Sequence, residues 1–166
     1  FIALALGSGA VRAEIAVTDD YGRQLRLEAP ARRVVSLAPP LTELMYAAGA
    51  GASLVGALQY SDYPSAARRL PRVGSEAQID LEALLALGPD LVVAWPNSGS
   101  TAAVERIAAL GIPVFRSEPR ELEDIARTLE TLGRLAGSEG AALAAAQAFR
   151  ARAARIERSY AAKPRV

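Results

Sequence analysis

The first candidate site is a loop in which two aromatic residues flank a polar pair, Tyr60-Ser61-Asp62-Tyr63-Pro64. The loop follows a short apolar run, residues 54–57, which predicts a β-strand. Pro64 fixes its own φ and restrains the residue before it, so we expect a stiff loop. A tyrosine ring offers a flat apolar face and one hydroxyl, which suits contact with a large, partly apolar ligand. Taken alone, the same pattern is equally typical of ordinary loop packing.

Two more loops are expected to reach the same edge of the fold. Residues 38–41 follow the apolar run 33–37, and residues 95–100 follow the run 91–95. The carboxyl ends of parallel strands meet at one edge of a sheet, where open α/β sheets bind ligands. We therefore predict one aromatic, neutral groove at this edge. Its expected ligand contacts are Pro40, Tyr60, Ser61, Asp62, Tyr63, Trp95 and Pro96.

The composition limits the chemistry of this groove. The 166 residues include no histidine and no cysteine, which excludes a Ser-His-Asp triad, a thiol nucleophile and a Cys/His zinc site within them. The sequence contains no tight cluster of Asp and Glu residues that would indicate a metal site. Asp62 is the only acid expected in the groove. The net charge of +1 argues against nucleic acid, which requires a concentrated basic surface. The groove thus predicts ligand binding without a cofactor, rather than catalysis.

The elements that position these loops alternate between strands and helices. This order predicts an α/β fold, with a mostly parallel sheet flanked by helices in one Rossmann-like lobe, residues 14–137. Two short runs around the turn at residues 19–22 add an N-terminal β-hairpin. The predicted strands are 15–17, 24–27, 33–37, 54–57, 91–95 and 112–115, and the predicted helices are 42–48, 80–87 (with Asp80 as its N-cap), 101–110 and 121–136.

A long helix is predicted over residues 138–162, because no helix breaker follows Gly140. Its apolar stripe at three-to-four spacing consists of Leu143, Ala146, Phe149 or Arg150, Ala153, Ile156 and Tyr160, with Arg152, Arg155 and Arg158 on the opposite face. The helix is either an ordinary terminal helix on the sheet or a rod that joins two lobes. Residues 163–166 resemble the start of a further strand, so we expect a truncated second lobe and a chain that is a fragment.

Residues 1–13 resemble the end of a secretory signal peptide, with Val11-Arg12-Ala13 as the cleavage site. A buried strand is the alternative for this segment. No other stretch is long enough to cross a bilayer, and no cysteine follows the signal to carry a lipid anchor. We therefore expect an exported, soluble, periplasmic monomer.

Several motifs of the chain resemble the periplasmic vitamin B12-binding proteins of cobalamin ABC importers, which belong to the helix-backbone class of solute-binding proteins. These motifs are residues 34–39, 42–44, 56–64, 70–74, 81–84 and 89–95, with a hairpin at 17–23 that is similar to the wider class. The resemblance covers residues 15–166 and implies one lobe and the inter-lobe helix of a two-lobe protein. It implies that cobalamin is a transported ligand, that Tyr60 and Trp95 contact the corrinoid, and that Glu82 docks on the permease of the membrane permease–ATPase complex.

Two departures from this family bear on binding. Glu76 stands in the stretch 74–78, where the resemblance implies an aromatic residue, so the pocket is expected to be weakened or re-tuned. The second lobe is also missing, and a cleft with one wall buries less ligand surface than a closed site. We therefore expect this chain alone to bind cobalamin weakly or not at all.

Three alternatives stay open. A haem carrier of the same class would use Tyr60 or Tyr63 as an iron ligand. A ferric-siderophore carrier would need clustered arginines, whereas Arg68, Arg69 and Arg72 are expected on a solvated helical turn. The alternative of a different class is an exported α/β enzyme whose catalytic residues lie in the missing half.

Overall fold

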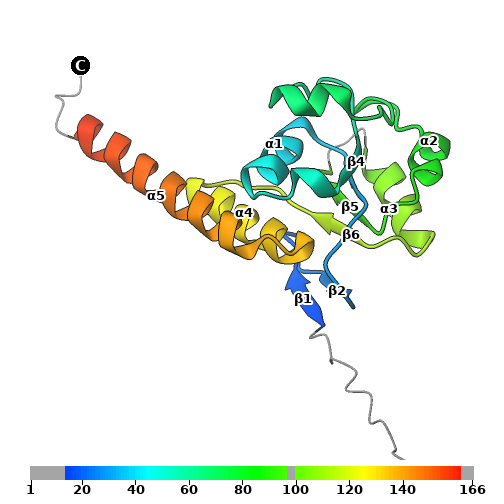
Figure 1. Ribbon diagram of the computed structural model, residues 1–166, viewed down its shortest axis with the longest axis horizontal. Coiled ribbons are helices and arrows are strands. Elements are labelled where there is room, and N and C mark those ends of the chain that lie inside the picture. The colour runs from blue at the N-terminus through cyan, green and yellow to red at the C-terminus, as the bar shows by residue number, and fades with distance from the viewer. Residues whose placement is uncertain (1–13, 97–99, 162–166) are drawn as a thin grey trace, which may run out of the picture.

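The computed structural model describes residues 14–96 and 100–161 (Figure 1). The predicted signal segment 1–13 and the predicted start of a second lobe at 163–166 lie outside the described residues. The elements in chain order are β1 (Ile15–Thr18), β2 (Gln24–Leu27), β3 (Val34–Ser36), α1 (Pro39–Ala47), the 3-10 helix η1 (Gly51–Ser53), β4 (Leu54–Ala57), the 3-10 helix η2 (Ser65–Arg69), α2 (Leu81–Ala86), β5 (Leu91–Ala94), α3 (Thr101–Ala109), β6 (Val114–Arg116), α4 (Leu122–Ala136) and α5 (Glu139–Ala161).

Four of the strands form one parallel sheet in the order β4-β3-β5-β6. Their sequences are short apolar runs such as Leu91-Val-Val-Ala94, in which every residue is buried. Such runs suit a sheet that is covered on both faces, because neither face of the strand meets water. The predicted mostly parallel sheet is therefore confirmed, as is the antiparallel β1–β2 hairpin.

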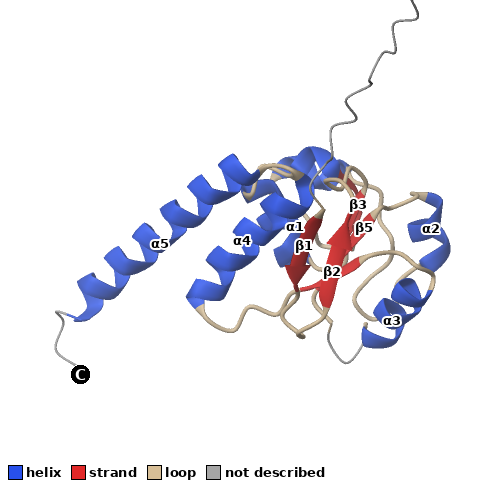
Figure 2. Ribbon diagram, turned by 90° about the horizontal axis from the view of Figure 1, so that it is seen from below, coloured by secondary structure: helices blue, strands red, loops and turns tan. Residues whose placement is uncertain are grey.

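Helices cover both faces of the sheet and form two separate cores. Residues of alternate parity point to opposite faces, so Val93 and Phe115 join the core beneath α1, α4 and α5, whereas Val92 and Val114 join the core beneath α2 and α3. Figures 1 and 2 show α4 and α5 on one side of the sheet and α2 and α3 on the other. The hairpin packs on the α4 side through Val17 and Leu25.

The helix boundaries follow local capping signals. α1 begins at Pro39, three residues before the predicted start, because proline is well tolerated where backbone N–H groups have no partner within the helix. The predicted N-cap of α2 is confirmed, since the Asp80 carboxylate accepts a hydrogen bond from the Ala83 N–H at 2.9 Å. Gly137 ends α4 with a left-handed φ of 72°.

The long C-terminal helix α5 packs against α4 over only part of its length. The two helices approach closely near Gly133, where an added Cβ would lie 2.2 Å from the Ala142 Cβ. Beyond that contact α5 projects away from the sheet (Figure 1). No helix within residues 14–96 and 100–161 combines the length and apolar character needed to cross a membrane.

The predicted apolar stripe of α5 is wrong at three positions. Leu143, Ile156 and Tyr160 are 49%, 51% and 66% exposed. Ala146 and Phe149 of the predicted stripe do pack on the core, and Ala142, which the stripe omitted, is buried beside them. Helical spacing correctly identified one apolar side of the helix, but it could not show which residues α4 and the sheet would cover.

Candidate ligand-binding site

The sheet has a topological switch point next to its central strand β3. The chain adds β4 on one side of β3 and then crosses over to add β5 on the other side. The loops that leave the carboxyl ends of β3 and β5 therefore turn in opposite directions, which opens a crevice between them. A cavity of about 350 Å³ lies at this point, and it is lined by Ala38, Pro40, Glu76 and Trp95.

Two predicted contacts, Pro40 and Trp95, come together in this cavity. Backbone pairing continues past the end of β3, where the Leu37 N–H donates to the Val93 carbonyl at 2.8 Å. Pro40 then lies in the first turn of α1, and Trp95 follows the buried end of β5. The Trp95 ring is half-buried and packs against the core under α1, so the wall of the cavity is firmly supported.

The tyrosine loop, residues 58–64, is anchored to the same edge by a buried hydroxyl cluster. The Thr42 hydroxyl lies 2.9 Å from the Ser36 Oγ and 3.2 Å from the Ser61 Oγ. All three side chains are buried. Buried hydroxyls need partners within the protein, so this cluster couples the end of β3, the first turns of α1 and the tyrosine loop. Ser61 thus supports the loop from inside.

Arg72 holds the tyrosine loop from the other side. Its Nη1 donates to the carbonyl oxygens of Leu58 at 3.0 Å and Ser61 at 3.2 Å, and its Nη2 pairs with the Asp62 carboxylate at 3.2 Å. The expectation that Arg72 lies on a solvated turn is therefore wrong: only Arg68 and Arg69 belong to η2. No local pattern indicates this role of Arg72, because the bonded groups lie 10 to 14 residues away.

The two tyrosines themselves extend into solvent. Tyr60 is 80% exposed and Tyr63 is 69% exposed, and neither lines the cavity. Tyr60 has a φ of 65°, in the left-handed region that bulky residues rarely adopt. Such an outlier persists only where the surrounding loop enforces it, and it is common at functional sites. The structure thus presents an exposed aromatic ring on a firmly held loop at the predicted edge.

Pro96 is placed by a contact that connects the N-terminal hairpin to the candidate site. The Tyr21 hydroxyl lies 2.8 Å from the Glu118 carboxylate and 3.3 Å from the Pro96 carbonyl. The hydrogen bond from Tyr21 holds the pKa of Glu118 below its usual value. Burial, followed by the bond to Glu118, raises the pKa of Tyr21. Sequence reasoning missed this contact, because 75 and 97 residues separate Tyr21 from its two partners.

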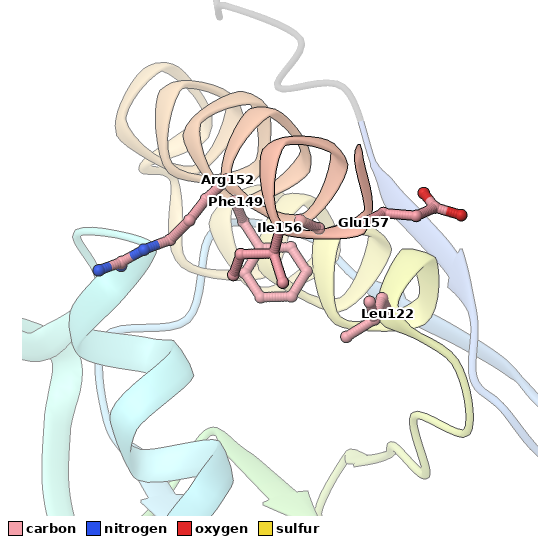
Figure 3. Close-up of a pocket in the computed structure, with 6 residues that line it drawn as sticks. Leu122, Phe149, Arg152, Ile156 and Glu157 are labelled. Carbon is pink, nitrogen blue, oxygen red and sulfur yellow. The ribbon is translucent and has the colours of Figure 1, made fainter. Parts of the chain in front are cut away.

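A second hollow lies far from this edge, between the start of α4 and the projecting part of α5. It has a volume of about 510 Å³ and is lined by Leu122, Phe149, Arg152, Ala153, Ile156 and Glu157 (Figure 3). Its lining comes from helices alone, without the strand ends that position a site in an open sheet. The cavity beside Trp95 is therefore the better candidate for the ligand site. Within the described ranges, no group of three or more acidic side chains could hold a metal ion.

Glu82, the predicted docking residue, lies apart from the cavity. It is an exposed residue in the first turn of α2, two residues after the Asp80 cap. A carboxylate at this position interacts favourably with the helix dipole, which is sufficient to explain its presence.

The family of the chain follows from comparison with known proteins. Residues 34–166 match the model of the periplasmic binding protein family. The chain belongs to this family. Vitamin B12-binding proteins of Yersinia pestis (strain Pestoides F) and Yersinia pseudotuberculosis (serotype O:1b, strain IP 31758) are each 44% identical to it over 120 residues, which are 72% of this chain and 43% of each relative. The chain thus spans less than half the length of these curated relatives.

Solved structures show the same fold. The periplasmic vitamin B12-binding protein of Vibrio cholerae matches with a TM-score of 0.77 at 38% identity, over 80% of this chain and 52% of that one. A periplasmic heme-binding protein from Pseudomonas aeruginosa matches with a TM-score of 0.69 at 32% identity, over 75% of this chain and 45% of that one. The sheet, its flanking helices and the long C-terminal helix are therefore those of one lobe of a solute-binding protein.

Proposed function

We propose that the protein is the solute-binding component of an ABC importer and that its ligand is cobalamin or a related corrinoid. The observation that carries this proposal is the cavity at the switch point, where Trp95 and Pro40 form an apolar wall beside an exposed aromatic loop. A large ring with apolar faces suits such a wall, because aromatic side chains bury much area against flat ligands. The similarity to vitamin B12-binding proteins supports the same ligand.

The remaining parts of the proposal concern location and delivery. We propose that the protein works in the periplasm, as its family name indicates, and passes its ligand to a membrane permease–ATPase complex. In that complex Glu82 would contact cationic side chains of the permease, because it is an exposed carboxylate at a helix start outside the ligand cavity. The ligand is cargo, and the proposal includes no chemical change to it.

Haem is the second candidate ligand, and the similarity to a heme-binding protein favours it. A haem carrier needs an axial ligand for the iron, and the chain contains no histidine. Tyr60 and Tyr63 are exposed enough to serve, but neither lines the cavity beside Trp95. The greater identity to vitamin B12-binding proteins places cobalamin first.

A spectral titration of the full-length protein separates these ligands. Cyanocobalamin, haemin and a ferric siderophore would each be added to the same protein, and the dissociation constants would be compared. We expect cyanocobalamin to bind most tightly. Tighter binding of haemin, with a tyrosinate-to-iron absorption band, would establish the second candidate instead.

A further inference from the structure

Among the described residues that line the cavity, one is charged and the other three are apolar. The lining of the cavity consists of Ala38, Pro40 and Trp95 together with the carboxylate-bearing Glu76. Within the part of the chain that the structure describes, Glu76 forms no hydrogen bond or ion pair, and it is exposed. Its charge is therefore not neutralised by a described neighbour and is available to a molecule that enters the cavity.

The backbone holds Glu76 in place through a tight turn. The Ser75 N–H donates to the Gln78 carbonyl at 2.9 Å, and the Gln78 N–H donates back to the Ser75 carbonyl at 3.2 Å. Gly74 precedes the turn with a φ of 101°, and a Cβ there would lie 2.2 Å from the Gln78 carbonyl oxygen. The Gly74 carbonyl in turn accepts the Gln59 N–H at 2.9 Å, which ties the turn to the tyrosine loop. The backbone position of Glu76 at the rim of the cavity is thus set by the fold.

A carboxylate next to apolar surface discriminates between ligands by their charge. It accepts hydrogen bonds from N–H groups, and these bonds are stronger than those between neutral groups. It repels a carboxylate of the ligand, because like charges that are close together at a partly desolvated site are unfavourable. Corrinoids such as cobalamin carry carboxamides around the ring, whereas haem carries two propionates and siderophores commonly bind iron through anionic oxygens.

We propose that Glu76 is a specificity-determining residue that selects neutral, carboxamide-bearing tetrapyrroles and rejects those that carry carboxylates at the same edge. This inference rests on the proposed function, because it concerns a ligand held in the cavity beside Trp95.

The test compares cyanocobalamin with its isomeric monocarboxylic acids, in which one side-chain carboxamide is replaced by a carboxylate. Dissociation constants for each isomer would be measured on the full-length wild-type protein and on Glu76→Gln, which keeps the size of the side chain and removes its charge. We expect the wild type to prefer cyanocobalamin over at least one isomer by about tenfold, the size of a single like-charge contact at such a site. Glu76→Gln should remove most of this preference, measured as the ratio of the two dissociation constants within each protein, and should also weaken cyanocobalamin binding, because an amide oxygen is a weaker acceptor than a carboxylate. The preference of the wild type should also shrink at high salt.

The matched control is Glu139→Gln, an exposed glutamate in the first turn of α5 that does not line the cavity. This variant should keep the wild-type preference for cyanocobalamin over each monocarboxylic acid. Equal discrimination by the wild type and Glu76→Gln would overturn the role of Glu76 while the proposed function stands. If haemin binds the wild type more tightly than cyanocobalamin, the proposed function is wrong. The proposed role of Glu76 in rejecting carboxylates is then wrong as well.

Discussion

Tyr60 has two unfavourable features, an exposed aromatic ring and a left-handed backbone, that a purely structural residue would avoid. Its ring is 80% exposed, and its backbone lies in the left-handed region. The loop beneath it is nevertheless well anchored, through the buried Ser61 hydroxyl and the guanidinium of Arg72. A ring held outward in this way is suited to a ligand that covers it.

Replacement of this ring gives the first prediction. Tyr60→Ala in the full-length protein should weaken cyanocobalamin binding by about 1–3 kcal/mol, the range for the loss of a stacked aromatic contact and its buried area. Tyr60→Phe keeps the ring face and should bind within about threefold of the wild type. Isothermal titration would measure both variants. An unchanged dissociation constant for Tyr60→Ala would exclude Tyr60 from the ligand contact.

At the scale of residues, the sequence predicted that Pro40 and Trp95 would lie together, but it did not predict the full lining of their cavity. Pro40 and Trp95 could be predicted together because each follows a strand, and the ends of parallel strands share an edge. The sequence marks Glu76 only as a departure from a family. Its place beside Trp95 depends on a contact between distant segments, which no local pattern predicts. Tyr21 was missed altogether, since hydrogen bonds between distant segments leave no periodic signal.

At the scale of elements, α5 depends on charged contacts as well as apolar packing. The Arg150 Nε donates to both Glu123 carboxylate oxygens at 3.0 Å, and its Nη1 pairs with Glu130, so one guanidinium bridges two turns of α4. The hydrogen bond from Arg150 is the main cause that lowers the pKa of Glu123. The same pairing with Glu123 and Glu130 raises the pKa of Arg150.

This pairing predicts a pH-dependent contribution to stability. A carboxyl group whose pKa is lower in the folded state than in the unfolded state stabilises the fold at pH values above its unfolded pKa, here 4.5. This contribution is lost as the pH falls through the folded pKa. Arg150→Met should therefore lower the thermal unfolding midpoint at pH 7, and the difference from the wild type should shrink toward about pH 3. Calorimetry at both pH values would measure it.

The control for this prediction is Arg155→Met, which removes an exposed arginine of the same helix. It should leave the midpoint close to that of the wild type at both pH values. A difference between Arg150→Met and the wild type that is the same at pH 7 and pH 3 would mean that Arg150 acts by packing rather than by its charge.

The elements show why periodicity alone could not describe α5. The predicted range of 138–162 agrees with the observed Glu139–Ala161, because helix propensity and the lack of breakers are local properties. Burial is set by the partner, however. α4 has 15 residues against the 23 of α5, so Ile156 and Tyr160 project beyond most of the surface that could cover them. The inter-lobe role of α5 stays a prediction.

At the scale of the whole molecule, the candidate ligand cavity and Glu82 lie on different surfaces. The cavity beside Trp95 opens at the carboxyl ends of β3 and β5, and Glu82 lies on α2, which packs on one face of the sheet. The order of strands and helices was enough to predict this layered arrangement, because parallel strands require crossovers and these have one handedness. A protein built in this way can bind a ligand and a membrane partner with different residues.

Separation of the two surfaces yields a prediction about transport. Glu82→Arg should leave cyanocobalamin affinity unchanged and weaken association with the permease–ATPase complex several-fold, because a reversed charge turns attraction into repulsion. Capture of the protein by the complex in nanodiscs would measure this effect. Glu139→Arg changes a comparable exposed glutamate in a first helical turn and should have no effect on association. Equal capture of Glu82→Arg and the wild type would remove Glu82 from the interface.

The position of Trp95 has a practical consequence for such measurements. The chain contains a single tryptophan, and its indole lines the cavity while it packs on the core beside α1. Within these 166 residues, indole emission under ultraviolet excitation therefore comes from one known place. A strongly absorbing macrocycle that binds next to Trp95 would quench this emission by energy transfer, so the fluorescence of Trp95 would report ligand binding directly.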